Sequence, residues 1–179
     1  MAWLQGLDSG LLFLIREHLA TPLLDSILLF CTTLGNKGAI WLLLGVGLLF
    51  SKKHRKAGFA VLLALVFCFF VGNLGLKPLL ARARPCWLYF DVPLLLPVPQ
   101  DFSFPSGHTM ASFAAACALL LLDRRLGIPA LVLAAVIGFS RLYLFVHFPT
   151  DVLAGALLGL LFGAAAVRVV KWAQAKRPA

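Results

Sequence analysis

The stretch SRLYLFVHFPTD, residues 140–151, places an arginine, a histidine and an aspartate between two strongly apolar runs. Ionisable side chains inside membrane-like segments cost about 2.5–3.5 kcal/mol each, so they usually serve a function. His147 and Asp151 lie four residues apart, at the boundary between the two runs. A structural Arg141–Asp151 ion pair between two helices is the alternative, but it leaves His147 unexplained.

The segment KPLLARARP carries Lys77 and Arg84 seven residues apart. If the segment is helical, both side chains project from one face about 10 Å apart, and Pro85 ends the helix. The pair could clamp an anion, or it could consist of interfacial cations whose charged ends reach toward water. This segment alone leaves both interpretations open.

The segment FPSGH predicts a helix start that binds an anion. Pro105 at a first helical position, followed by Ser106 and Gly107, exposes free backbone N–H groups and the positive end of the helix dipole. The glycine allows a ligand to approach the backbone closely. His108, in the first turn, is either a capped surface residue or an acid or base beside the anion.

Composition indicates the elements that must position these residues. Of the 179 residues, 61% are hydrophobic and 13% are charged, and the mean hydropathy is +0.96. We therefore expect an all-α polytopic membrane protein, a bundle of about six transmembrane helices. The predicted spans are residues 22–34, 38–50, 57–76, 105–122, 128–146 and 150–170.

The amino-terminal part of this division has an alternative. Gly35, Asn36, Lys37 and Gly38 separate two short apolar stretches, which could instead form one span. Residues 1–21 carry charges and are expected to form an interfacial helix. A cleavable signal peptide is not expected, because no basic region precedes the first apolar run. The whole chain, 1–179, should form one domain.

The 16 Lys and Arg residues predict the orientation, because positive residues in short loops favour the cytoplasmic side. The residues assigned to that side are Arg16, Lys52, Lys53, Arg55, Lys56, Arg124, Arg125, Arg168, Lys171, Lys176 and Arg177. The other side receives Lys37, Lys77, Arg82, Arg84 and Arg141. The three segments and the loop 82–104 should then meet at the extracytoplasmic end, with a cytoplasmic carboxyl terminus.

Such a meeting point is strongly cationic, which favours a phosphate ligand, since guanidinium groups contact two oxygens at once and lysine adds a point charge. No metal is expected, because the seven acidic residues form no carboxylate cluster, and no cofactor is implied. Nucleic-acid binding is not expected either, because the cations are divided among loops instead of forming one basic face.

In order and spacing, the three segments resemble the signature motifs of the type-2 phosphatidic acid phosphatase superfamily. That family includes bacterial lipid phosphatases, eukaryotic lipid phosphate phosphatases and vanadium haloperoxidases. Its usual pattern is Lys, six residues, Arg-Pro; then Pro-Ser-Gly-His; then Ser-Arg, five residues, His, three residues, Asp. Residues 77–151 match it without a gap.

The resemblance implies a role for each matched residue. The histidine matching His147 forms a phosphohistidine, the aspartate matching Asp151 orients it, and the histidine matching His108 protonates the leaving oxygen and later activates water. The residues expected to hold the phosphoryl oxygens are Lys77, Arg84, Ser106, Gly107 and Arg141. Neither chemical step in this scheme needs a metal.

We therefore expect a metal-independent phosphatase of lipid phosphates or diphosphates in a bacterial plasma membrane. Compact size and short loops resemble enzymes that convert undecaprenyl diphosphate, the recycled carrier lipid of cell-wall synthesis, to undecaprenyl phosphate. Phosphatidylglycerophosphate, phosphatidic acid and diacylglycerol diphosphate are alternative substrates. Arg82, Trp87 and Tyr89 are predicted to select the headgroup from their place in the loop.

Three other functions are alternatives to a lipid phosphatase. A vanadate-dependent haloperoxidase would use the same pocket, but such relatives are generally soluble. A transporter usually shows half-helices or repeats, which do not appear in this sequence. A non-enzymatic membrane protein would have little reason to keep both histidines and the aspartate at this spacing. The partners expected are the bilayer and its lipid phosphate, and the oligomeric state is left open.

Overall fold

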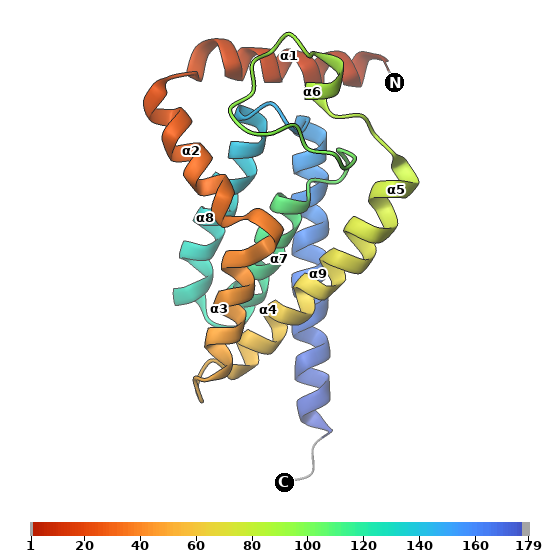
Figure 1. Cartoon of the computed structure of the whole chain (residues 1–179). Helices are drawn as coiled ribbons and strands as arrows, with labels where there is room; N and C mark the ends of the chain where they lie inside the picture. Colours follow the sequence, from red (N-terminus) through yellow and green to blue (C-terminus); the bar gives the residue numbers. More distant parts are fainter. Residues whose placement is uncertain (1, 177–179) are drawn as a thin grey trace.

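The computed structural model describes residues 2–176, which form helices and one long loop (Figure 1). The elements are α1 (Ala2–Leu19), α2 (Pro22–Leu34), η1 (Asn36–Gly38), α3 (Ala39–Leu49), α4 (Arg55–Phe67), η2 (Cys68–Leu76), α5 (Lys77–Leu80), α6 (Pro85–Leu88), α7 (Gly107–Leu122), α8 (Arg124–Tyr143) and α9 (Pro149–Ala175). No strand occurs among these residues, and the predicted all-α class is confirmed.

Three helical runs are long and apolar enough to cross a membrane: Arg55–Leu88, Arg124–Tyr143 and Pro149–Ala175. The pair α2 and η1–α3 meets the same test only when taken together, with a bend of 43° between its halves. The helix α7 is also apolar but is shorter than these runs. Figure 1 shows the bent pair running from the end near α1 to the opposite end of the molecule.

The predicted spans 22–34 and 38–50 thus have the length and composition of a span only when they are joined, and we call the joined segment the bent span. Its break is a short 3-10 turn in which Lys37 and Gly38 have φ angles of 53° and 70°, a left-handed geometry that interrupts the helix. Gly35 allows the break to touch α7, because a Cβ there would lie 2.9 Å from Cδ2 of His108. The bend thus brings the middle of this span against the start of α7.

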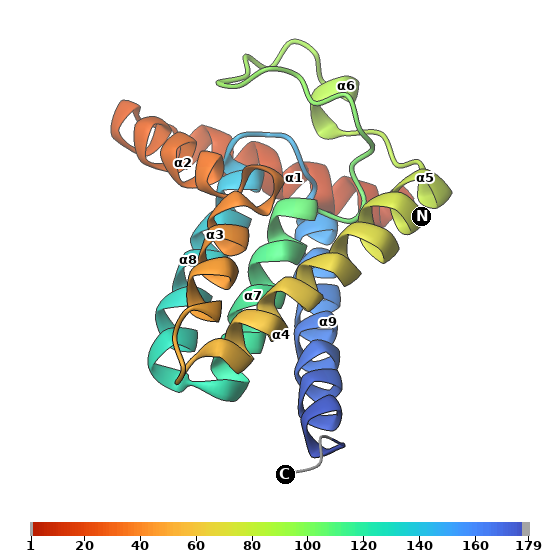
Figure 2. The ribbon, with the colours of Figure 1, turned by 60° about the horizontal axis from the view of Figure 1, so that its bottom comes forward.

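The helix α1 lies across one end of the bundle (Figures 1 and 2). It buries Leu12 completely against Phe145 and Phe148, while Leu7, Leu11 and other apolar residues stay exposed. An apolar helix placed in this way fits a membrane interface. The interfacial assignment of residues 1–21 stays a prediction with which this placement agrees.

At the centre of the bundle, α7 packs against α8 and α9. The contact with α9 is close because Gly155, Gly159 and Gly163 repeat at intervals of four residues. A Cβ at these positions would lie 2.4–2.7 Å from backbone oxygens of α7 or its N-cap. This small-residue face fixes the start of α7 beside the start of α9, where Ser106 N donates to the carbonyl of Asp151 at 3.1 Å.

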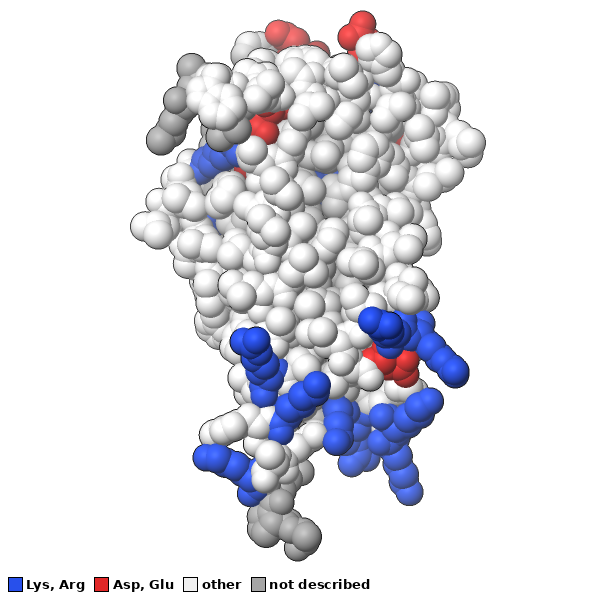
Figure 3. Space-filling model, turned by 180° about the vertical axis from the view of Figure 1, so that it is seen from behind, with Lys and Arg blue, Asp and Glu red and all other residues white. Residues whose placement is uncertain are grey.

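The cations in the α3–α4 connection, in the α7–α8 connection and near the end of α9 gather at the end opposite α1 (Figure 3). Two predicted assignments are wrong. Arg16 donates to the carbonyl of Pro93 at 3.0 Å, so it lies at the α1 end. Lys37 lies in the break within the bent span, not in a loop between two spans. Both errors follow from dividing one span into two. Arg177 lies outside the described residues.

Two helix boundaries near the motifs also differ from prediction. The expected helix from Lys77 to Arg84 ends at Leu80, Ala81 is left-handed at φ 44°, and Arg84 is extended. Pro85 begins α6 instead of ending a helix, because its fixed φ suits a first helical position. Likewise, α7 begins at Gly107 with Ser106 as its N-cap, so Pro105 precedes the helix.

Candidate active site

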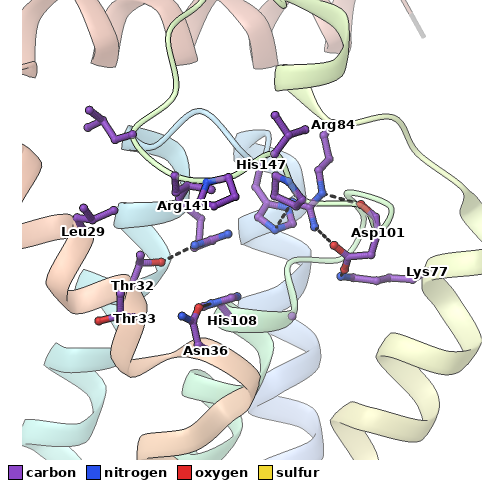
Figure 4. A pocket seen from close by; sticks show the side chains of 16 residues that line it. Leu29, Thr32, Thr33, Asn36, Lys77, Arg84, Asp101, His108, Arg141 and His147 are labelled. Carbon is purple, nitrogen blue, oxygen red and sulfur yellow. Dashed lines mark hydrogen bonds and ion pairs between the residues drawn. The ribbon is translucent and has the colours of Figure 1, made fainter.

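A cavity of about 550 Å³ lies where α5, the start of α7, the end of α8 and the loop after α6 meet (Figure 4). Its polar lining includes most of the predicted residues: Lys77, Arg84, Gly107, His108, Arg141 and His147. Among the residues predicted to be catalytic or to hold phosphate, only Ser106 and Asp151 do not line it, and both are fully buried. The three motifs thus meet at one site, as their chemistry requires.

His147 lies in the short connection between α8 and α9 and is 1% exposed. Its Nε2 is 3.0 Å from Nη1 of Arg84, which can only donate, so Nε2 accepts and the proton resides on Nδ1. Burial first, and the positive charge of Arg84 next, lower the pKa of His147 well below its ordinary value. The ring is therefore neutral, with the unprotonated Nε2 on the side of the cations.

Asp151 stands behind His147, in the first turn of α9. Its Oδ2 accepts from Ser103 at 2.5 Å and from the amide of Phe148 at 2.8 Å, and lies 3.6 Å from Nδ1 of His147. Ser103 Oγ is 3.4 Å from the same Nδ1. The carboxylate thus orients the imidazole through a small network that includes Ser103, because 3.6 Å is longer than a hydrogen bond.

The structural alternative, an Arg141–Asp151 ion pair, is not what the structure shows. Oδ1 of Asp151 pairs with Nη1 of Arg82 at 2.5 Å. Arg82 also contacts Asp8 of α1 at 2.6 Å and Thr150 at 2.7 Å. These contacts support a positioning role for Arg82 behind the site, while headgroup selection by this residue stays a prediction.

Arg141 reaches the cavity from the last turn of α8 and is 4% exposed. Its Nη1 donates to Thr32 of α2, its Nε has no hydrogen-bond partner, and no carboxylate of the described chain pairs with it. A buried guanidinium without a counter-charge is unfavourable unless an anion joins it. The cavity thus contains a buried positive charge that an anion would compensate.

Lys77 and Arg84 converge on one carboxylate, although the segment between them is not one helix. Lys77 donates to Oδ2 of Asp101, and Nη2 of Arg84 donates to Oδ1 at 2.7 Å (Figure 4). Burial alone would raise the pKa of Asp101, but the hydrogen bond from Lys77 and the charge of Arg84 lower it to about 2. The carboxylate is ionised and occupies donors that could otherwise hold phosphate oxygens.

His108 lies in the first turn of α7, and its Nε2 is 3.0 Å from Oδ1 of Asn36 in the break of the bent span. The first amides of α7, including that of Gly107, have no partner within the helix and are available to an anion. The hydroxyl of Ser106 is 2.9 Å from that of Thr109 and is fully buried. The predicted contact of Ser106 with phosphate therefore stays a prediction.

Residues 53–175 of this chain match the PAP2 superfamily, in agreement with the geometry of the three motifs. The chain belongs to the PAP2 superfamily. It is 32% identical over 149 residues to an undecaprenyl-diphosphatase of Sulfolobus acidocaldarius, covering 83% of this chain and 71% of that protein. It is 31% identical over 144 residues to undecaprenyl-diphosphatase BcrC of Bacillus subtilis, covering 78% of this chain and 72% of that protein.

A solved structure agrees with the fold. The crystal structure of a transmembrane PAP2-type phosphatidylglycerolphosphate phosphatase from Bacillus subtilis has a TM-score of 0.75 to this PAP2 chain, with 29% identity over 99% of this chain and 89% of that one. The resemblance drawn from the motifs is thereby confirmed. The chain is a membrane lipid phosphatase. The family match and the apolar helices favour this function over the haloperoxidase, transporter and non-enzymatic alternatives.

Several residues of this PAP2 site were not predicted: Asn36, Asp8, Asp101 and Ser103. Each reaches the motifs from a distant part of the chain, so no local spacing signals it. The acidic Asp101 in a loop already suspected of function was the nearest available signal. Trp87 and Tyr89, predicted to select headgroups, hold this loop in place: Trp87 donates to the carbonyl of Pro99 at 3.0 Å, and Tyr89 donates to Ser9 of α1 at 2.9 Å.

The position of Asp101 predicts that it competes with phosphate for two cations of the PAP2 site. Replacing Asp101 with asparagine should lower the inhibition constant for inorganic phosphate by about 10-fold, since hydrogen bonds between charged groups are the strong ones. Inhibition of purified enzyme by phosphate measures this. Weaker inhibition in the variant would instead show that the carboxylate holds both cations in a productive position.

Proposed function

We propose that this protein hydrolyses a lipid diphosphate, undecaprenyl diphosphate in the first place, to the lipid monophosphate and inorganic phosphate. The reaction proceeds through a phosphohistidine on His147 and needs no metal. The observation that carries this proposal is the buried guanidinium of Arg141, which has no carboxylate partner among the described residues, in the cavity that His147 also lines with its unprotonated Nε2 turned toward Arg84. A phosphoryl group supplies the charge that this arrangement lacks.

In the first step, Nε2 of His147 attacks the terminal phosphorus, and the bond from phosphorus to the leaving oxygen breaks. His108 donates a proton to that oxygen as it leaves. The proton on Nδ1 of His147 remains beside Asp151 and Ser103, which stabilise the positive charge that the ring acquires. The products of this step are the phosphohistidine and the lipid monophosphate.

In the second step, His108 removes a proton from water, and the hydroxide formed attacks the phosphohistidine. The Nε2–phosphorus bond breaks, which restores neutral His147 and releases inorganic phosphate. During both steps Lys77, Arg84 and Arg141 face the phosphoryl oxygens with the first amides of α7. These groups supply the charge stabilisation that a metal provides in other phosphatases.

A second cavity supports a lipid as the substrate. It has a volume of about 1140 Å³ and is mostly apolar, with Leu62, Phe69 and Phe70 in its wall. It adjoins the first cavity at four shared residues, Lys77, Asp101, Gly107 and His108. Its apolar residues come mainly from α4 and η2, which belong to a run long and apolar enough to cross a membrane. A prenyl or acyl chain can lie there while its phosphate occupies the cationic cavity.

The charge distribution supports an extracytoplasmic site in a bacterial plasma membrane. Removing Arg16 from the cytoplasmic group leaves the other described cations of that group at the end opposite the site (Figure 3). The positive-inside rule then directs the site outward and the carboxyl terminus inward.

A second candidate function is hydrolysis of phosphatidylglycerophosphate. It is favoured by the similarity to the Bacillus subtilis structure named above, whose fold covers nearly the whole chain. Phosphatidic acid and diacylglycerol diphosphate would fit the same chemistry. The two undecaprenyl-diphosphatases named above favour the diphosphate.

Phosphate release from detergent-purified protein tests the proposal. Undecaprenyl diphosphate, phosphatidylglycerophosphate and phosphatidic acid are compared side by side, each with and without EDTA. We expect undecaprenyl diphosphate to give the highest kcat/KM, with a rate unchanged by EDTA. Loss of activity in EDTA would contradict the metal-free mechanism, and preference for phosphatidylglycerophosphate would establish the second candidate.

A further inference from the structure

Lys37 occupies an unfavourable place for a lysine. It lies in the break between α2 and α3, within a span, where charged side chains are costly. Its φ of 53° is a left-handed geometry that glycine or asparagine adopts more readily. Backbone geometry therefore does not favour lysine here. We look for the role of this residue in the interactions of its side chain.

The side chain of Lys37 is exposed and makes no hydrogen bond or ion pair with any residue that the structure describes. It lines the second, mostly apolar cavity, and the only other Lys or Arg there is Lys77, which is paired with Asp101. Lys37 thus offers an uncompensated positive charge in the cavity assigned above to the lipid.

The two cavities show on which side of the reacting groups Lys37 lies. His147, Arg84 and Arg141 line only the first cavity, Lys37 lines only the second, and His108 lines both. Because His108 protonates the leaving oxygen, the leaving group must extend from His108 away from His147. It therefore extends into the second cavity, where Asn36, bonded to His108, is followed directly by Lys37.

We propose that Lys37 binds the phosphate that stays on the lipid, and thereby makes the enzyme selective for lipid diphosphates over monophosphates. In a diphosphate, the leaving group is itself a phosphate whose negative charge grows as the bond breaks. The ammonium group can bind its non-bridging oxygens and stabilise that charge. A monophosphate places only an alcohol oxygen and hydrocarbon in this cavity. This inference rests on the proposed function.

Farnesyl diphosphate and farnesyl phosphate test the proposal, because they share one chain and differ by one phosphate. The full chain in detergent is assayed as wild type, Lys37→Asn and Lys37→Arg, with Lys53→Asn in the α3–α4 connection as the matched control. Asparagine removes the charge yet suits the left-handed backbone.

For Lys37→Asn we expect kcat/KM to fall about 10- to 100-fold on the diphosphate and less than about 3-fold on the monophosphate, as for loss of one hydrogen bond between charged groups. Lys37→Arg should retain most of the selectivity, and Lys53→Asn should match wild type. Equal losses on both substrates, or no loss on the diphosphate, would overturn the inference. Hydrolysis of neither substrate by wild type would instead count against the proposed function itself.

Discussion

Replacing His147 with alanine will reduce kcat for lipid-phosphate hydrolysis by at least about 10³-fold, because the nucleophile carries a covalent step that water cannot take over at a comparable rate. The side chain is buried and its Nε2 contacts only Arg84 among the described residues. Phosphate release from the purified variant measures the loss. Any activity that remains reflects charge stabilisation by the surrounding cations.

The control for this prediction is Lys53→Ala. Lys53 lies in the α3–α4 connection, at the end of the molecule opposite the site, and should leave kcat unchanged. Equal losses in both variants would mean that the assay reports folding, not chemistry. Elution of both variants as monodisperse protein in detergent is the accompanying check.

Replacing Arg141 with methionine will lower activity and raise stability together. We expect kcat/KM to fall about 10²- to 10³-fold, as for removal of one preorganised donor to a transition-state charge. The free energy of unfolding should stay equal or rise by about 1–2 kcal/mol, because a buried cation without a counter-charge is replaced by an apolar side chain. Thermal unfolding in detergent and kinetics on the same preparations measure both.

Arg82→Met is the matched comparison, since this arginine is paired with Asp8 and Asp151. Its removal leaves two buried carboxylates with fewer partners, so Tm should fall. A lower Tm in Arg141→Met as well would contradict an anion-binding role for Arg141 and restore a structural one.

The catalytic groups could be predicted because they lie within short motifs. Arg141, His147 and Asp151 lie on either side of and within the short connection between α8 and α9, and α9 begins at Pro149, next to the start of the predicted span 150–170. Lys77 and Arg84 lie close together as predicted, but for a different geometric reason. They meet through an extended segment and Asp101, not on one helical face.

The partners of these groups could not be predicted, because they depend on tertiary contacts. Asn36 reaches His108 only because the first span bends at residues 35–38, and hydropathy gives the apolar length of a span but not a bend within it. The same bend accounts for the wrong placement of Arg16 and Lys37. Ser103 reaches Asp151 from the loop, and Asp8 of α1 reaches Arg82, the ion-pair partner of Asp151, across separations that no local pattern encodes.

The most direct test of the mechanism is to trap the phosphorylated enzyme. Protein mixed with undecaprenyl diphosphate is quenched in alkali, where phosphohistidine survives, and the peptide containing His147 is analysed by mass spectrometry in wild type and His147→Ala. The account predicts an acid-labile phosphate on His147 during turnover that disappears when substrate is exhausted. Phosphate on another residue, or full turnover by His147→Ala, would contradict it.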